Sequence, residues 1–133
     1  MRYLLDTNVC IRYLNGQSEK ICQQLSMKNP EEIALCAIVK AELIYGVYKS
    51  RNQARNLQKL FLFFEPFISL PFEDEASGVY GRIRSQLDQA GTPIGPNDLM
   101  IAAIAIANNV TLVTHNTSEF SRIGSLYIED WEH

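Results

Sequence analysis

The chain has 133 residues, of which 47% are hydrophobic and 20% charged, and its net charge is −3 at pH 7. This composition is typical of one folded domain with its own core and excludes intrinsic disorder. The longest uncharged apolar run, Leu99 to Ala107, is too short to cross a bilayer, and Asp6 interrupts the apolar N-terminal stretch too early for a secretory signal.

The N-terminal half alternates between strand and helix patterns. A buried strand at residues 2–5 ends at Asp6, and apolar residues at helical spacing follow it as far as Gly16. Ser18 is predicted to cap a second short helix that ends near Asn29. The other elements predicted here are a strand over Ile33 to Ala37, a helix from Ile38 that carries Glu42, and an amphipathic helix from Asn52 to Phe64.

The C-terminal half continues the alternation. Phe67 to Leu70 is predicted to form a short strand, and a long helix over Ala76 to Leu87 is terminated by Gly91. Asp98 opens an apolar helix that extends over Leu99 to Ala107. The last predicted elements are a strand over Val110 to Thr114, one helical turn over Thr117 to Phe120, and a strand over Leu126 to Ile128.

The three cysteines are not spaced like a zinc or redox motif. Cys10, Cys22 and Cys36 are odd in number, and we expect them to be unpaired hydrophobic side chains in a reducing compartment. We therefore expect the protein to act in the cytoplasm.

Three acidic residues, Asp6, Glu42 and Asp98, stand at a strand end or close to a helix start. Strands alternating with helices, without repeat or linker, predict a single α/β domain over residues 1–133 with a mostly parallel sheet. Ligands bind at the carboxyl edge of such a sheet, and all three acids are predicted to lie there. Each acid taken singly is explained equally well as a helix cap or a solvated side chain.

A positive group is expected among these acids. Two carboxylates about 4 Å apart repel by roughly 4 kcal/mol at an effective dielectric near 20. No basic residue is assigned there, because Arg2 begins the first strand and Lys40 lies on a different helix face from Glu42. Oxygen ligands without His or Cys favour Mg²⁺ or Mn²⁺. Such an ion activates water and neutralises charge on a phosphodiester.

The end of the fourth strand adds polar residues to the same edge. Thr114 is predicted to hydrogen-bond a ligand carboxylate, and Asn116 or Glu119 to reach the metal or its waters. His115 alternates to the side opposite Thr114, which argues against a role as catalytic base.

Four motifs follow one another between residues 4 and 120: Leu-Leu-Asp6-Thr7-Asn8, Ala-Glu42-Leu-Ile-Tyr-Gly46, Gly95-Pro-Asn-Asp98-Leu-Met-Ile-Ala-Ala, and Leu-Val-Thr114-His-Asn116-Thr-Ser-Glu119-Phe120. In this combination and order, the chain resembles the PIN-domain endoribonucleases of the VapC toxin family. The resemblance covers essentially the whole chain.

The resemblance implies a five-stranded sheet in the order 3-2-1-4-5, flanked by helices. It also implies a Mg²⁺ cofactor, with Mn²⁺ as a substitute, and endonucleolytic cleavage of RNA that leaves a 5′-phosphate and a 3′-hydroxyl. Structured RNA, such as a tRNA, is the implied substrate class. The protein would be the toxin of a type II toxin–antitoxin system, neutralised by a VapB antitoxin.

The resemblance also assigns residues. Asp6, Glu42 and Asp98 match the catalytic, metal-binding acids of the family. Glu119 is the candidate fourth acid, because Asn116 occupies a position where many relatives have Asp. Supporting positions, which hold ligands or waters, are Thr7, Asn8, Thr114 and Asn116.

Partner contacts are implied as well. Family members form homodimers through helices that include the one carrying Glu42, or larger assemblies with the antitoxin, whose carboxyl tail lies over the first helices and the fourth. Phe61, Phe63 and Phe64 agree with such contacts, although ordinary core packing explains each of them equally well. Basic candidates for RNA phosphates are Arg12, Lys49 and Arg84, with solvated surface charge as the alternative.

Other functions fit less well. A phosphoryl-accepting receiver domain needs a lysine after the fifth strand, where Glu129 and Asp130 stand, and a DxD phosphatase needs an acid in place of Asn8. A catalytically silent PIN-like module that binds RNA or protein is the remaining alternative. Retention of all three acids, Asp6, Glu42 and Asp98, favours the nuclease.

Overall fold

Five parallel strands form the central sheet of the computed structural model, which describes residues 1–133. Their order is β3-β2-β1-β4-β5, and every pairing is parallel, which confirms the predicted sheet and its order. The strands are β1 (Tyr3–Leu5), β2 (Ile33–Cys36), β3 (Ile68–Leu70), β4 (Thr111–Val113) and β5 (Ile128–Glu129). The central strand β1 is buried along its whole length.

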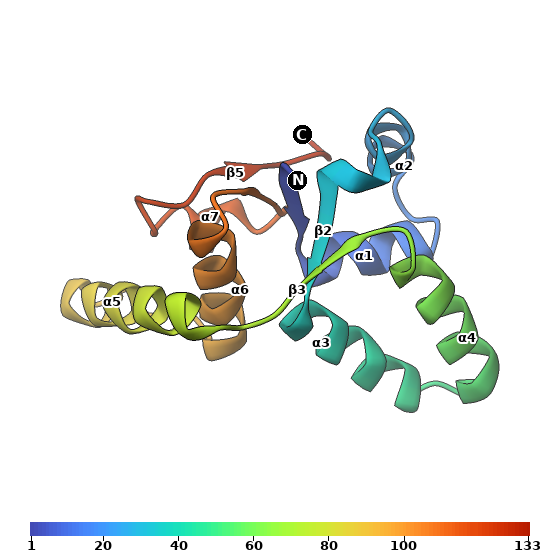
Figure 1. Cartoon of the computed structure of the whole chain (residues 1–133), viewed down its shortest axis with the longest axis horizontal. Coiled ribbons are helices and arrows are strands. Elements are labelled where there is room, and N and C mark those ends of the chain that lie inside the picture. The colour runs from blue at the N-terminus through green and yellow to red at the C-terminus, as the bar shows by residue number, and fades with distance from the viewer.

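Helices cover both sides of this sheet. They are α1 (Thr7–Leu14), α2 (Glu19–Ser26), α3 (Ala37–Tyr48), α4 (Gln53–Phe64), α5 (Asp74–Ala90), α6 (Pro96–Ala107) and α7 (Thr117–Phe120), with one 3₁₀ turn at Pro30–Glu32. In Figure 1, α3 and α4 form a hairpin at the lower right, whereas α5 and α6 lie at the left. The two termini lie close together, because Tyr3 packs edge-on against Trp131 with 5.5 Å between ring centroids.

Two predicted helix boundaries are confirmed by their capping geometry. The Ser18 side chain accepts a hydrogen bond from the Ile21 amide at the start of α2. Gly91 ends α5 with φ +72°, a left-handed conformation in which a residue without Cβ is unstrained. No helix is long and apolar enough to cross a membrane.

Two strand ends differ from the prediction. The second strand stops at Cys36, because Ala37 already belongs to α3. The last strand was placed two residues too early at its start: Leu126 packs into the core from a loop, and pairing begins at Ile128. Burial alone produces the same apolar pattern in a loop as in a strand, so periodicity does not separate them.

Helix α6 is the most buried helix and fixes one side of the site. Leu99 and the five residues from Ile101 to Ala105 are 0–2% exposed, and the helix packs against both α5 and β4. A helix that is apolar on all sides belongs in the core. Its first turn, with Asp98, is thereby held at the carboxyl edge of the sheet.

The cysteines and the aromatic end of α4 have ordinary packing roles. All three cysteines are free, as predicted, and burial raises the pKa of the Cys36 thiol to about 11. Phe64 is buried and Phe63 packs against Phe67 with 5.3 Å between ring centroids, so the core interpretation holds for these two. Phe61 remains 51% exposed.

Candidate active site

Asp6 is the central acid of the site. It follows β1 directly, caps α1 by accepting a hydrogen bond from the Thr7 amide at 2.8 Å, and is only 5% exposed. The hydroxyl of Thr114, which follows the neighbouring strand β4, donates to the other Asp6 oxygen at 2.8 Å. The hydrogen bond predicted for Thr114 is therefore present, and both oxygens of the buried carboxylate are satisfied.

Glu42 reaches the same edge from α3, which packs against α1 and α6. The Thr7 hydroxyl donates to Glu42 Oε1 at 2.6 Å, and the Asn97 side-chain amide donates to Oε2 at 3.5 Å. Thr7 thus holds two carboxylates, Asp6 through its amide and Glu42 through its hydroxyl.

Glu119 is connected to the other side of Asp6. The Asn116 side-chain amide donates to Glu119 Oε2 at 3.0 Å, and the Asn116 backbone amide donates to the Thr114 hydroxyl at 3.0 Å. An unbroken series of hydrogen bonds therefore links seven residues across the sheet edge. This carboxylate network consists, in order, of Glu119, Asn116, Thr114, Asp6, Thr7, Glu42 and Asn97.

Asp98 lies beside the carboxylate network without joining it. Its carboxylate accepts no side-chain hydrogen bond, and partial burial together with the negative charges of Asp6, Glu42 and Glu119 raises its pKa to about 6. Burial also raises the pKa of Asp6, against the opposing effect of its two hydrogen bonds. None of the three ion pairs in the structure involves these acids.

The donors present at the site fit a hard divalent cation. They are carboxylate oxygens without a histidine or cysteine, and the charge that they gather has no basic counterpart. No three of these acids converge as ligands on one point in this structure, so direct coordination by all three stays a prediction. Glu42 and Glu119 are each turned toward hydroxyl or amide donors. Mg²⁺ typically takes only one or two carboxylates directly and keeps several waters.

Asn97 is the site residue that sequence reasoning missed. The cap alternative for Asp98 is wrong, because the N-cap of α6 is Gly95. The available signal was position: Asn97 precedes Asp98 in a turn that faces α3. Its contact with Glu42 spans 55 positions in the sequence.

Other predicted site residues lie outside the carboxylate network. Asn8 is exposed and makes no side-chain hydrogen bond. Arg12 forms an ion pair with Glu132 at 2.8 Å, and Arg84 donates to the Tyr80 hydroxyl at 2.7 Å. His115 is exposed and pairs with Asp130 at 3.0 Å, away from the carboxylates, as expected.

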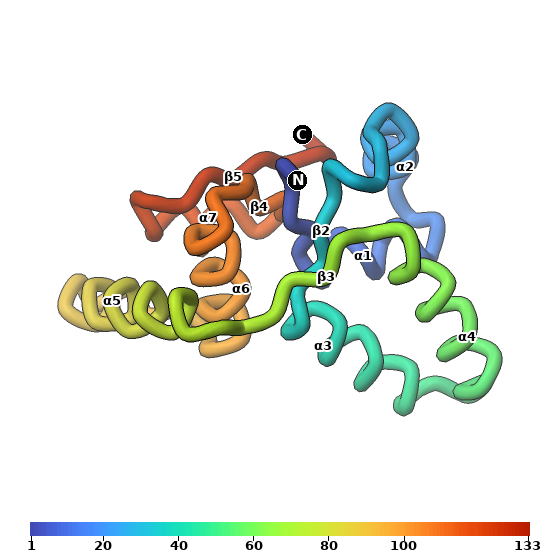
Figure 2. Tube along the Cα trace, viewed as in Figure 1, coloured from blue at the N-terminus to red at the C-terminus, as the bar shows by residue number.

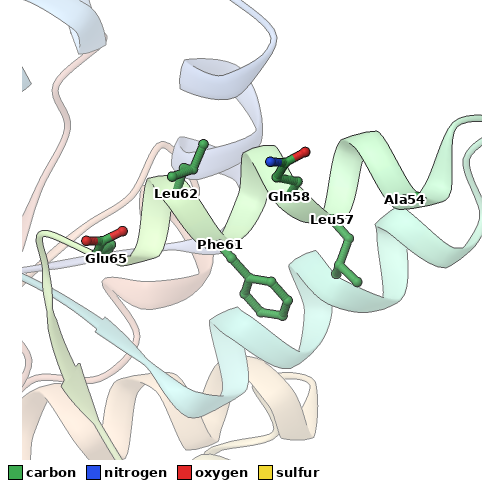
Figure 3. Close-up of a pocket in the computed structure, with 6 residues that line it drawn as sticks. All are labelled: Ala54, Leu57, Gln58, Phe61, Leu62 and Glu65. Carbon is green, nitrogen blue, oxygen red and sulfur yellow. The ribbon is translucent and has the colours of Figure 1, made fainter.

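Two hollows adjoin α4. A groove of about 410 Å³ runs between α1, α3 and α4, with Glu42 among its lining residues together with apolar side chains such as Leu14 and Leu43. The second hollow lies on α4 alone, where Phe61 points toward the α3 side and Leu62 toward the opposite side (Figure 3). Only the first hollow includes a residue of the carboxylate network.

The sequence and the fold both match known proteins. The PIN domain family matches residues 3–126. Ribonuclease VapC2 of Rickettsia felis is 42% identical over 99% of each chain, and the tRNA(fMet)-specific endonuclease VapC of Salmonella typhimurium is 37% identical over 98% of each. The crystal structure of DNA-bound VapBC from Salmonella typhimurium superposes with a TM-score of 0.93, covering 98% of both chains.

The raised pKa of Asp98 predicts a pH-dependent stability. A carboxyl group whose pKa is higher in the folded than in the unfolded state binds its proton more tightly when the protein is folded. Protonation of Asp98 therefore increases the free energy of unfolding as the pH falls from about 6 toward the ordinary carboxyl pKa of 3.8. In EDTA, Asp98→Asn should therefore raise the melting temperature at pH 7.5, and this gain should shrink at pH 4.5. Thermal unfolding followed by circular dichroism measures both. The control is Asp88→Asn on the exposed face of α5; an equal gain at both pH values, or a loss at pH 7.5, contradicts the prediction.

Proposed function

The chain belongs to the PIN domain family and, within that family, to the VapC ribonucleases. On that premise we propose that it is a metal-dependent endoribonuclease, which acts as the toxin of a type II toxin–antitoxin pair. The observation that carries the proposal is the carboxylate network beside Asp98 at the carboxyl edge of the sheet. Closely spaced acids without a basic partner favour the binding of a cation. In this family such a cation supports phosphodiester hydrolysis.

We assign Asp6, Glu42 and Asp98, with Glu119 as the fourth acid, to a Mg²⁺ site that also accepts Mn²⁺. When bound, the ion would supply activated water and neutralise charge on the phosphodiester. Asp98 has no competing hydrogen-bond donor, so its charge is the one most available to a cation. Asp6 is fixed by two donors and provides the rigid centre of the site.

The neutral donors in the carboxylate network have a positioning role. Thr7 and Thr114 hold Asp6 between them, and Thr7 also sets the orientation of Glu42. Asn116 does the same for Glu119. Donors of this kind fix ligand orientation and typically change metal affinity or activity by about 10- to 100-fold when lost. Asn8 is assigned to water or substrate, since it is exposed beside this edge.

Structured RNA such as tRNA is the proposed substrate. The relative from Salmonella typhimurium is named for cleavage of tRNA(fMet), and it matches this chain over 98% of its length. We place the reaction in the cytoplasm, where RNA is available and the three free cysteines stay reduced. Which RNA is cut is a property of surfaces outside the carboxylate network.

A VapB-type antitoxin is the proposed partner, in a heterooligomer built on a toxin homodimer. Several matched structures are VapBC complexes. We assign the antitoxin tail to the groove between α1, α3 and α4, because an apolar segment seated on Leu14 and Leu43 would end beside Glu42. Occupation of that groove would block access to the acid and so silence the toxin.

Asp98→Asn should abolish cleavage of RNA, by about two orders of magnitude or more, because the acid most available to the cation is lost. The assay is cleavage of purified tRNA in Mg²⁺, with and without EDTA, followed by gel electrophoresis. Asp88→Asn is the matched control and should cut like the wild type. Wild-type cutting by Asp98→Asn would refute the assignment, and a wild type that cuts no RNA in Mg²⁺ or Mn²⁺ would identify a silent binding module.

Thr7→Val keeps the size of the side chain but removes the hydroxyl that holds Glu42. We expect the Mg²⁺ concentration that gives half-maximal cleavage to rise about tenfold, whereas Thr7→Ser, which retains the hydroxyl, should restore it. Thr111→Val, at the start of β4 on the far edge, is the control for general effects of this substitution. A rate that falls equally in the Val and Ser variants would show that Thr7 matters only for packing.

A further inference from the structure

One arginine joins the two segments that carry Asp98 and Glu119. The Arg122 side chain donates a hydrogen bond from Nη1 to the Pro93 carbonyl at 3.1 Å, across 29 positions of the sequence. Arg122 follows the single turn of α7 that carries Glu119, and Pro93 lies in the loop that leads from α5 into α6. Figure 2 shows α7 and the segment after it on the same side of the molecule as α5 and α6. We call this hydrogen bond the Arg122 bridge.

The acceptor of the Arg122 bridge lies on a fixed support. Ile94, the residue after Pro93, is buried. Gly95 then caps α6, and its carbonyl accepts a hydrogen bond from the Leu99 amide at 3.0 Å. Asp98 belongs to the helical turn that begins where this loop ends, and α6 itself is buried on nearly all sides. Whatever is attached to the Pro93 carbonyl is therefore held at a constant place relative to Asp98.

Helix α7 needs an external support, because a helix of one turn is not stable in water on its own. Phe120 and Ile123 are buried and fix its apolar side, and the Arg122 amide donates to the Glu119 carbonyl at 3.1 Å. The Glu119 carboxylate accepts a hydrogen bond only from Asn116, which is the N-cap of the same turn. The Arg122 bridge is thus the hydrogen bond that ties the end of this turn to the entry of α6.

The charge of Arg122 does not neutralise the acids. Its side chain is exposed and forms no ion pair. The pKa of Asp98 is raised by burial and by the charges of Asp6, Glu42 and Glu119, with no opposing effect from Arg122. The guanidinium therefore lies outside the cluster of carboxylates, and the place of a cation among them stays free of it. What Arg122 contributes to the site is geometry.

We propose that Arg122 is a positioning residue of the cation site, which ties α7 to the entry of α6 and so fixes Glu119 relative to Asp98. This inference rests on the proposed function and adds to its site a residue that touches neither metal nor RNA. Carboxylates that are already held in place bind a cation more tightly, because less ordering has to accompany binding. Loss of the Arg122 bridge should therefore weaken cation binding. A purely electrostatic role has the opposite sign, since a nearby guanidinium repels a divalent cation.

The first test measures Mn²⁺ affinity by titration calorimetry at pH 7.5. Arg122→Met keeps a long apolar stem but removes the donor, and it should bind Mn²⁺ about fivefold more weakly than the wild type. Arg122→Lys retains a donor and a charge and should restore the affinity. The matched control is Arg82→Met, which removes an exposed charge from α5 and should bind like the wild type.

The second test asks whether Arg122 acts through Glu119. In a Glu119→Gln background, the addition of Arg122→Met should cause no further loss of Mn²⁺ affinity, because the effects of residues that act together are not additive. Cleavage kinetics provide a separate criterion. Arg122→Met should raise the Mg²⁺ concentration that gives half-maximal cleavage, and at saturating Mg²⁺ it should leave the KM for RNA unchanged.

Hydrogen exchange in EDTA provides a readout that needs neither metal nor RNA. The Ile123 amide donates to the Phe120 carbonyl at 3.1 Å at the end of α7, and the Thr111 amide donates to the Arg2 carbonyl at 2.9 Å within the sheet. Arg122→Met should accelerate exchange of the Ile123 amide, because local opening of α7 becomes easier, and should leave the Thr111 amide unchanged.

Four outcomes overturn the inference. The first is Mn²⁺ binding by Arg122→Met that is unchanged or tighter, the latter being the result of charge alone. The second is a full additional loss of affinity in the Glu119→Gln background. The third is a raised KM for RNA with unchanged Mn²⁺ affinity, which would make Arg122 a phosphate contact. The fourth is equal acceleration of exchange at both amides, which would indicate a general loss of stability. A wild type that binds Mn²⁺ but cuts no RNA contradicts the proposed function instead, so the two failures are distinguishable.

Discussion

Like-charge repulsion among four carboxylates at one sheet edge is the constraint on which the rest of this structure depends. Asp6, Glu42, Asp98 and Glu119 gather there with no ion pair to a lysine or arginine, and partial burial together with the charges of the other three acids raises the pKa of Asp98 to about 6. Neutral hydroxyl and amide donors hold three of the acids in place. The fourth is left without a donor, and it is the one that a cation would stabilise most.

The fold imposes this arrangement through its buried elements. β1 and β4 are neighbours in the sheet, so the residues that follow them, Asp6 and Thr114, meet without any loop rearrangement. Helix α6 is buried on nearly all sides and fixes Asp98, while α3 carries Glu42 in from the other flank.

Whether an interaction could be predicted from the sequence depends on how far apart its partners are along the chain. An acid directly after a buried strand can be recognised from the local sequence, and Asp6 was predicted for this reason. The strand order was predicted from the family resemblance. Asn97 contacts Glu42 across 55 positions and Arg12 pairs with Glu132 across 120, and no local pattern encodes such pairs. The orientations of Glu42 and Glu119 were not predicted either, because they depend on the Thr7 hydroxyl and the Asn116 side-chain amide.

The central claim is that these carboxylates act together as one cation site. Titration calorimetry of Mn²⁺ into the purified protein at pH 7.5 tests it most directly, with Glu42→Gln as the comparison because that variant loses charge but keeps its shape. The account predicts saturable binding by the wild type and binding at least about tenfold weaker in the variant. Equal binding by both proteins, or no saturable heat with the wild type, would contradict it.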